Sequence, residues 1–110
     1  MSKRISNRIR PAVVFAALGD KTRLAIVARL SSGKPASIVH LTAGSRLTRQ
    51  AVTKHLRVLQ HAGIVRSTRA GRESLFTLDP QPVLALQDYL DRVSRNWDQA
   101  LARLKSFVED

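Results

Sequence analysis

Apolar residues recur through most of the chain at steps of three and four, the spacing that places them on one face of an α-helix. Pro11 suits the first turn of one such helix, and Asp20 is a good N-cap for the next. In that second helix we expect Leu24, Val27 and Leu30 to form the inward stripe. The pattern therefore predicts three helices in the N-terminal half, over residues 11–18, 21–30 and about 37–43.

A fourth helix is predicted from the N-cap candidate Thr48 to His61, closed by a glycine two residues later. Beyond it the period of the pattern changes. The next segment reads IVRSTRAGRESLFTL and has two β-rich ends around a basic turn, for which Ala70 and Gly71 are suited. This change of period predicts a β-hairpin directly after the fourth helix.

A long helix is expected over about residues 82–108, after Pro80 and Pro82 punctuate the chain. Its apolar residues recur without a break at helical spacing. The chain thus contains three helices, a turn, a fourth helix, a hairpin and a long helix, which is the order of a winged helix-turn-helix. We predict a mostly α fold with a small β-hairpin, forming one domain over residues 11–110. Residues 1–10 are polar and basic, and we expect them to be a disordered arm whose contact with DNA is left open.

The charge of the chain is uneven. It has 19 Lys and Arg against 8 Asp and Glu, a net charge of +11. Residues 1–72 contain a single acid, Asp20, whereas residues 73–110 are mildly acidic. Such a division favours one surface facing a polyanion and another facing something else, with solubility alone as the alternative.

The fourth helix divides into two faces. Val52, Leu56 and Leu59 fall on the side expected to pack on the domain. The opposite side carries the residue types that read base edges and phosphates in a DNA major groove. These are Arg49, Gln50, Thr53, Lys54 and Arg57, to which we add Thr48 at the helix start, His55 as a packing or phosphate-binding residue, and Arg66, Arg69 and Arg72 of the hairpin as a DNA-binding wing.

Several chemistries are not expected. The chain has no cysteine, and its three histidines are too few and too poorly spaced for a metal site. No Ser/His/Asp set, carboxylate pair or Gly-rich phosphate loop is present, so we expect neither an enzyme nor a cofactor. No signal peptide or membrane span is recognisable, and we therefore expect a soluble, cytoplasmic protein.

Three segments, FAALGDKTRLAIVARL, LTRQAVTKHLRVLQHAGIV and RAGRESLFTLDP, together resemble the ArsR/SmtB family of bacterial winged-helix repressors. The resemblance runs from about Phe15 to the C-terminus. It implies a homodimer on palindromic operator DNA, in which the first and last helices form the dimer interface. The interface residues that this implies are Val13, Leu86, Leu90, Val93, Trp97, Leu101 and Leu104.

The chain departs from the metal-sensing members of that family, which carry a cysteine pair in the third helix or His and Asp ligands in the last. Ser37 and Val39 stand at the third-helix positions, and no histidine follows His61. The resemblance is thus to a cysteine-free branch, with a small-molecule or protein effector unidentified. In the turn, Thr42 and Arg46 also differ from the residues usual in the family.

Our hypothesis is a homodimeric transcriptional regulator, a repressor acting on an inverted repeat. Two alternatives remain open at this point. One is an architectural protein that coats DNA without sequence preference, and the other is a protein-interaction module on a winged-helix fold. A footprint on DNA distinguishes the first alternative from the hypothesis, since it shows either one short palindrome or diffuse coverage.

Overall fold

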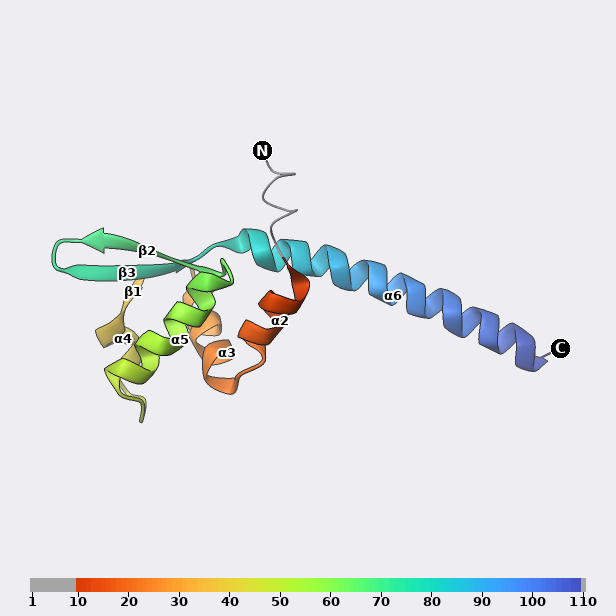
Figure 1. Cartoon of the computed structure of the whole chain (residues 1–110), viewed down its shortest axis with the longest axis horizontal. Helices are drawn as coiled ribbons and strands as arrows, with labels where there is room; N and C mark the ends of the chain where they lie inside the picture. Colours follow the sequence, from red (N-terminus) through yellow and green to blue (C-terminus); the bar gives the residue numbers. More distant parts are fainter. Residues whose placement is uncertain (1–9, 110) are drawn as a thin grey trace.

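The computed structural model describes residues 10–109. Its fold is the winged helix-turn-helix expected, mostly helical with one small antiparallel sheet (Figure 1). The basic arm was predicted over residues 1–10, of which residues 1–9 lie outside the described residues. The elements in chain order are α2 (Pro11–Leu18), α3 (Lys21–Leu30), β1 (Ala36–Ser37), α4 (Ile38–Thr42), α5 (Arg49–His61), β2 (Val65–Ala70), β3 (Glu73–Leu78) and α6 (Pro80–Glu109).

Side-chain caps fix the starts of three helices. The Asp20 carboxylate accepts the backbone N–H of Arg23 at 3.0 Å, which caps α3 as the sequence predicted. The Thr48 hydroxyl oxygen likewise accepts the backbone N–H of Ala51 at 3.1 Å and caps α5. Ser37 caps α4 in the same way. These bonds satisfy donors that a helix start otherwise leaves free.

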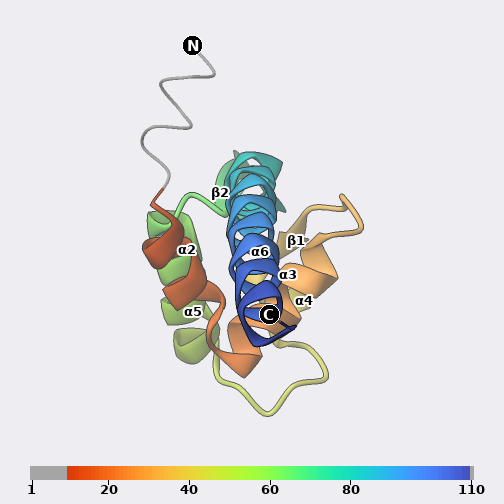
Figure 2. The same ribbon diagram turned by 90° about the vertical axis from the view of Figure 1, so that its right-hand side faces the viewer.

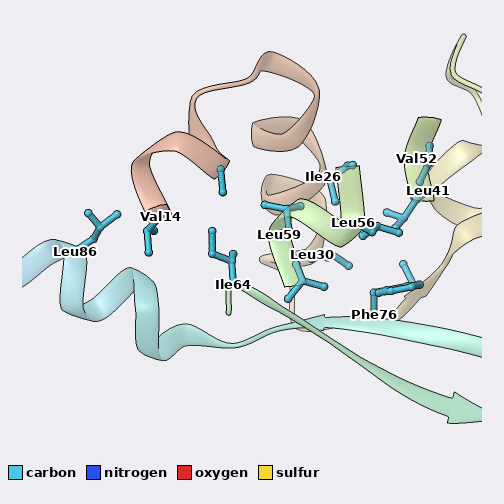
Figure 3. Packing of buried hydrophobic residues seen from close by; sticks show 13 residues of the cluster. Val14, Ile26, Leu30, Leu41, Val52, Leu56, Leu59, Ile64, Phe76 and Leu86 are labelled. Carbon is cyan, nitrogen blue, oxygen red and sulfur yellow. The ribbon is translucent and has the colours of Figure 1, made fainter. Parts of the chain in front are cut away.

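The hydrophobic core lies where α5 meets α2, α3 and the base of the hairpin (Figure 3). Leu56 and Leu59 of α5 are completely buried there, together with Leu30 and Ile64. The stripe predicted for α3 is partly wrong, because Leu24 is exposed. Ile26 occupies the core in its place, beside the partly buried Val27 and the buried Leu30.

The sheet has three strands in the order β1-β3-β2, all antiparallel. The strand β1 was not predicted, because a strand of two residues is too short to show an alternating pattern in the sequence. In it, Ala36 pairs with Phe76 and Ser37 with Leu75 of β3. The hairpin itself is confirmed, but its turn lies one residue later than expected. Ala70 is still paired, with Glu73, so the loop consists of Gly71 and Arg72. Gly71 has a φ of 65°, a conformation that glycine adopts easily and that a tight two-residue hairpin loop requires at its first position.

The long helix α6 begins at Pro80, two residues before the predicted start. The Asp79 carboxylate accepts the backbone N–H of Gln81 at 3.0 Å, and prolines fit a first helical turn because their missing N–H would be unpaired there. With 30 residues, α6 is about 45 Å long. Its first turns pack on the body of the domain, and the rest projects away from it (Figures 1 and 2).

Candidate nucleic-acid interface

The helix α5 packs on the domain through its apolar side. In the chain it is preceded by α4 and by the turn that joins the two helices. Val52, Leu56 and Leu59 are buried, as predicted. In the turn, the Ser45 hydroxyl donates to the carbonyl of Thr42 at 2.9 Å and accepts the backbone N–H of Leu47 at 3.1 Å. The turn therefore has its own hydrogen bonds and fixes the angle between α4 and α5.

The side of α5 opposite the core is exposed and carries no acid. At 100° per residue, Gln50, Lys54 and Arg57 point directly away from the buried leucines, and all three are exposed. Arg49 and Thr53 lie on the same flank of α5 as Gln60, whose side chain bonds to Ser67 of the hairpin. The Thr53 hydroxyl donates to the carbonyl of Arg49 at 2.7 Å, so its methyl group and its oxygen, as an acceptor, remain free for contact.

His55 lies away from this polar face, and of the two roles predicted for it, packing or phosphate binding, its contacts in the structure are those of packing. Its Nδ1 lies 3.4 Å from the Arg23 guanidinium and 3.8 Å from the Asp20 carboxylate, at the junction of α3 and α5. The same guanidinium donates to the carbonyls of Ala17 and Ala16 at the end of α2. His55 is therefore part of a joint between three helices, because its position on α5 points back toward the body.

The Asp20 carboxylate in this joint is held in its charged form. The backbone N–H of Arg23 is the main cause that lowers the pKa of Asp20, and the nearby charges of Arg23 and His55 act in the same direction. Partial burial opposes them without reversing the sign.

The three wing arginines have different surroundings in the structure. Arg66 lies at the base of the hairpin, where its guanidinium forms an ion pair with Asp79 at 2.9 Å. Its charge is thereby partly neutralised, a difference from the other two that the sequence did not predict. Arg69 and Arg72 are exposed near the tip. A hydrogen bond from Gln60 to Ser67, 3.1 Å long, ties the wing to α5.

Residues 18–68 match the family described as Helix-turn-helix domain. The chain is 36% identical over 99 residues to the HTH-type transcriptional regulator Rv2034 of Mycobacterium tuberculosis, covering 90% of this chain and 89% of that protein. It is also similar to the structure of an ArsR-like transcriptional regulator from Rhodococcus sp. RHA1, with 36% identity, a TM-score of 0.82 and 89% coverage of each chain. The chain belongs to the ArsR family.

Membership of the ArsR family settles the general activity. The protein is a transcriptional regulator with a helix-turn-helix DNA-binding domain, and the family is not one of enzymes. A second ArsR-family structure, 29% identical and covering 79% of this chain, has a TM-score of 0.72.

Within residues 10–109, no three His, Asp or Glu side chains lie close enough together to bind a metal ion. Over the same residues, no helix is both long enough and apolar enough to cross a membrane.

The residues expected at an ArsR-type dimer interface fall into three groups. Leu86 is only 5% exposed and packs in the core, so it is unavailable to a partner, contrary to expectation. Val13 lies on the side of α2 that faces the C-terminal end of α5, and it lines a hollow there with Pro82 of the first turn of α6. The remaining five continue along one face of α6 beyond the body, where Val93 is half-buried and Leu90, Trp97, Leu101 and Leu104 are exposed.

Sequence reasoning missed two further apolar features next to that face. Phe15 of α2 and Tyr89 of α6 form an edge-to-face aromatic pair with centroids 6.2 Å apart. Both remain partly exposed, and Phe107 near the end of α6 is 80% exposed. The helical spacing of Phe107 relative to Leu104 is the signal that could have found it.

Proposed function

We propose that the protein is a homodimeric repressor that binds operator DNA with an inverted repeat through α5 and the hairpin tip. The observation that carries this proposal is the exposed face of α5, which is polar and basic, contains no acid and is rigidly capped. Arg49 and Gln50 are the residues for base edges, since each can form two hydrogen bonds to a purine. Lys54 and Arg57 serve phosphates, as do Arg69 and Arg72 of the wing.

The cap of α5 supports the placement of these side chains. Thr48 holds the first turn, so the side chains of Arg49 and Gln50 leave a helix end of defined direction. The backbone N–H groups of the first turn that the cap does not engage also favour a phosphate. We assign Thr48 to phosphate positioning and not to base reading.

The projecting part of α6 supports a dimer. From Leu86 onward, apolar residues alternate at steps of four and three, the spacing with which one helix packs against another. They are Leu90, Val93, Trp97, Ala100, Leu104 and Phe107, and we call this set the α6 seam. In the proposed dimer the seam packs against the partner, and two-fold symmetry sets the recognition helices about 34–36 Å apart, one turn of DNA.

A footprint on genomic fragments enriched by the protein tests the proposal. We expect one short protected palindrome with two half-sites about one helical turn apart. Diffuse protection along every fragment would instead favour an architectural DNA-coating protein, the alternative that the net charge also permits. Absence of any enrichment over bulk DNA would contradict both.

A further inference from the structure

A groove runs between α2 and the C-terminal half of α5, which lie beside each other in Figure 2. It consists of two adjoining hollows of about 590 and 370 Å³, which share Val13, His61 and Ala62. The larger hollow has an apolar floor, formed by Val13, Ala16, Ala17, Val58 and Ala62. Val13 and Phe15 lie about 200° apart around α2, so the groove is separate from the aromatic pair with α6.

Arginine and histidine side chains surround the groove and form its rim. Arg23, Arg57 and His61 line the larger hollow, and Arg10 lines the smaller one. No acidic side chain lines either hollow. Asp20 accepts the backbone N–H of Arg23 but stays outside the groove.

The guanidinium of Arg23 is partly engaged and partly free. Its Nε donates to the carbonyl of Ala17, one terminal nitrogen donates to Ala16, and the other contacts His55. Because a guanidinium has five N–H bonds, two remain for an anion. Arg23 is held in place by these contacts, so it offers those two donors without having to be ordered by a ligand.

We propose that this groove binds an amphipathic carboxylate with an unbranched apolar tail, and that occupancy weakens operator binding. Charge complementarity selects the anion, since the rim has cations and no acid. The apolar floor selects the tail, whereas a DNA phosphate would leave that floor unused. The larger hollow falls within the roughly 300–1,000 Å³ typical of small-molecule sites.

The effect on DNA, which rests on the proposed function, follows from Arg57. This side chain belongs both to the rim and to the exposed face of α5. A carboxylate paired with Arg57 removes one cation from the phosphate contacts of each protomer. Decanoate is a simple carboxylate of this kind and serves as the probe. We expect it to lower operator affinity and to reduce the slope of log affinity against log salt by about one per protomer.

The experiment uses decanoate and its neutral analogue decanol, titrated into the ¹⁵N-labelled full chain without DNA. Decanoate should shift the backbone resonances of Val13, Val58 and Ala62 with saturation, and decanol should not. Val58→Asn is the test variant and Val39→Asn its matched control, because the two valines are 41% and 49% exposed and Val39 lies on α4, outside the groove. Val58→Asn should weaken decanoate binding about five- to thirtyfold, and Val39→Asn should leave it unchanged.

Three results would overturn the proposal. The first is the absence of a saturable shift in the resonances of the groove residues when decanoate is added. The second is a response to decanol equal to that to decanoate, or an equal decanoate affinity of Val58→Asn and Val39→Asn. The third is saturable decanoate binding that leaves operator affinity unchanged. Because the resonance titration contains no DNA, its outcome is independent of whether the proposed operator recognition holds.

Discussion

Replacing Leu104 by aspartate should dissociate the proposed dimer while leaving each protomer folded. Leu104 lies on the α6 seam, far beyond the point where α6 leaves the body, and it is 59% exposed in the single chain. Full burial of a leucine side chain contributes about 1.5–3 kcal/mol of stabilisation. Burial of the 59% of Leu104 that is still exposed would therefore stabilise the dimer by roughly 0.9–1.8 kcal/mol per protomer. Two-fold symmetry doubles this to about 1.8–3.5 kcal/mol, an increase in dimer Kd of about 20- to 400-fold.

The assay is a dilution series followed by sedimentation equilibrium and by the emission of Trp97, the only tryptophan in the chain and a member of the same seam. The matched control is Ala102→Asp, which adds the same charge to the same helix on the opposite face. We expect Leu104→Asp to become monomeric at concentrations where Ala102→Asp and the unchanged chain are dimers. Equal dimer Kd values for the two variants, or an unchanged chain that is monomeric throughout, would refute the reasoning.

Three more predictions concern the cap, the charged joint and the wing. Thr48→Ala removes the α5 cap and should lower the free energy of unfolding by about 1 kcal/mol in urea titrations; no change would mean that the cap bond is not needed. The pKa of Asp20 is lowered in the folded state, chiefly by the Arg23 backbone N–H. The charged carboxylate therefore stabilises the fold at pH values above its pKa in the unfolded chain, and this stabilisation is lost as the pH falls through its pKa in the folded chain. Asp20→Asn, which retains a capping oxygen, should therefore flatten the decline in stability below about pH 4, and an unchanged decline would contradict this. Arg72→Ala should reduce the salt slope of DNA binding by about one per protomer, whereas Arg66→Ala, whose guanidinium already has a carboxylate partner, should reduce it less; the reverse order would contradict the assigned roles.

The recognition helix was predictable because its signals are local. A capping threonine and apolar residues at helical spacing specify its start, its length and which side packs inward. The structure confirms the Thr48 cap and the burial of Val52, Leu56 and Leu59. The polar face follows directly as the remaining side of the same helix.

Features that depend on partners distant in sequence were not predictable in this way. His55 contacts Arg23, 32 residues away, and Arg66 pairs with Asp79, 13 residues away, and neither contact leaves a periodic signal. The misassigned stripe in α3 has the same origin, because Leu24 and Ile26 both occur among apolar neighbours at helical spacing. Only packing against α5 and β3 determines which of the two is buried.

The prolines near the start of α6 show a second kind of failure. Sequence reasoning treated Pro80 as punctuation before the helix, although proline is also favoured in a first turn. The Asp79 cap decides between these interpretations. A capping residue immediately before a proline is therefore evidence for a helix start at that proline.

The central claim is that the exposed face of α5 reads the operator, and base-by-base affinity measurements with two α5 variants test it most directly. Binding of the unchanged chain, Gln50→Ala and Lys54→Ala is measured on the footprinted operator and on a set of single base-pair changes. We predict that Gln50→Ala abolishes the preference at one position of each half-site, worth about 1–3 kcal/mol, while Lys54→Ala weakens all sequences alike. Retention of every base preference by Gln50→Ala, together with a changed preference in Lys54→Ala, would contradict the account.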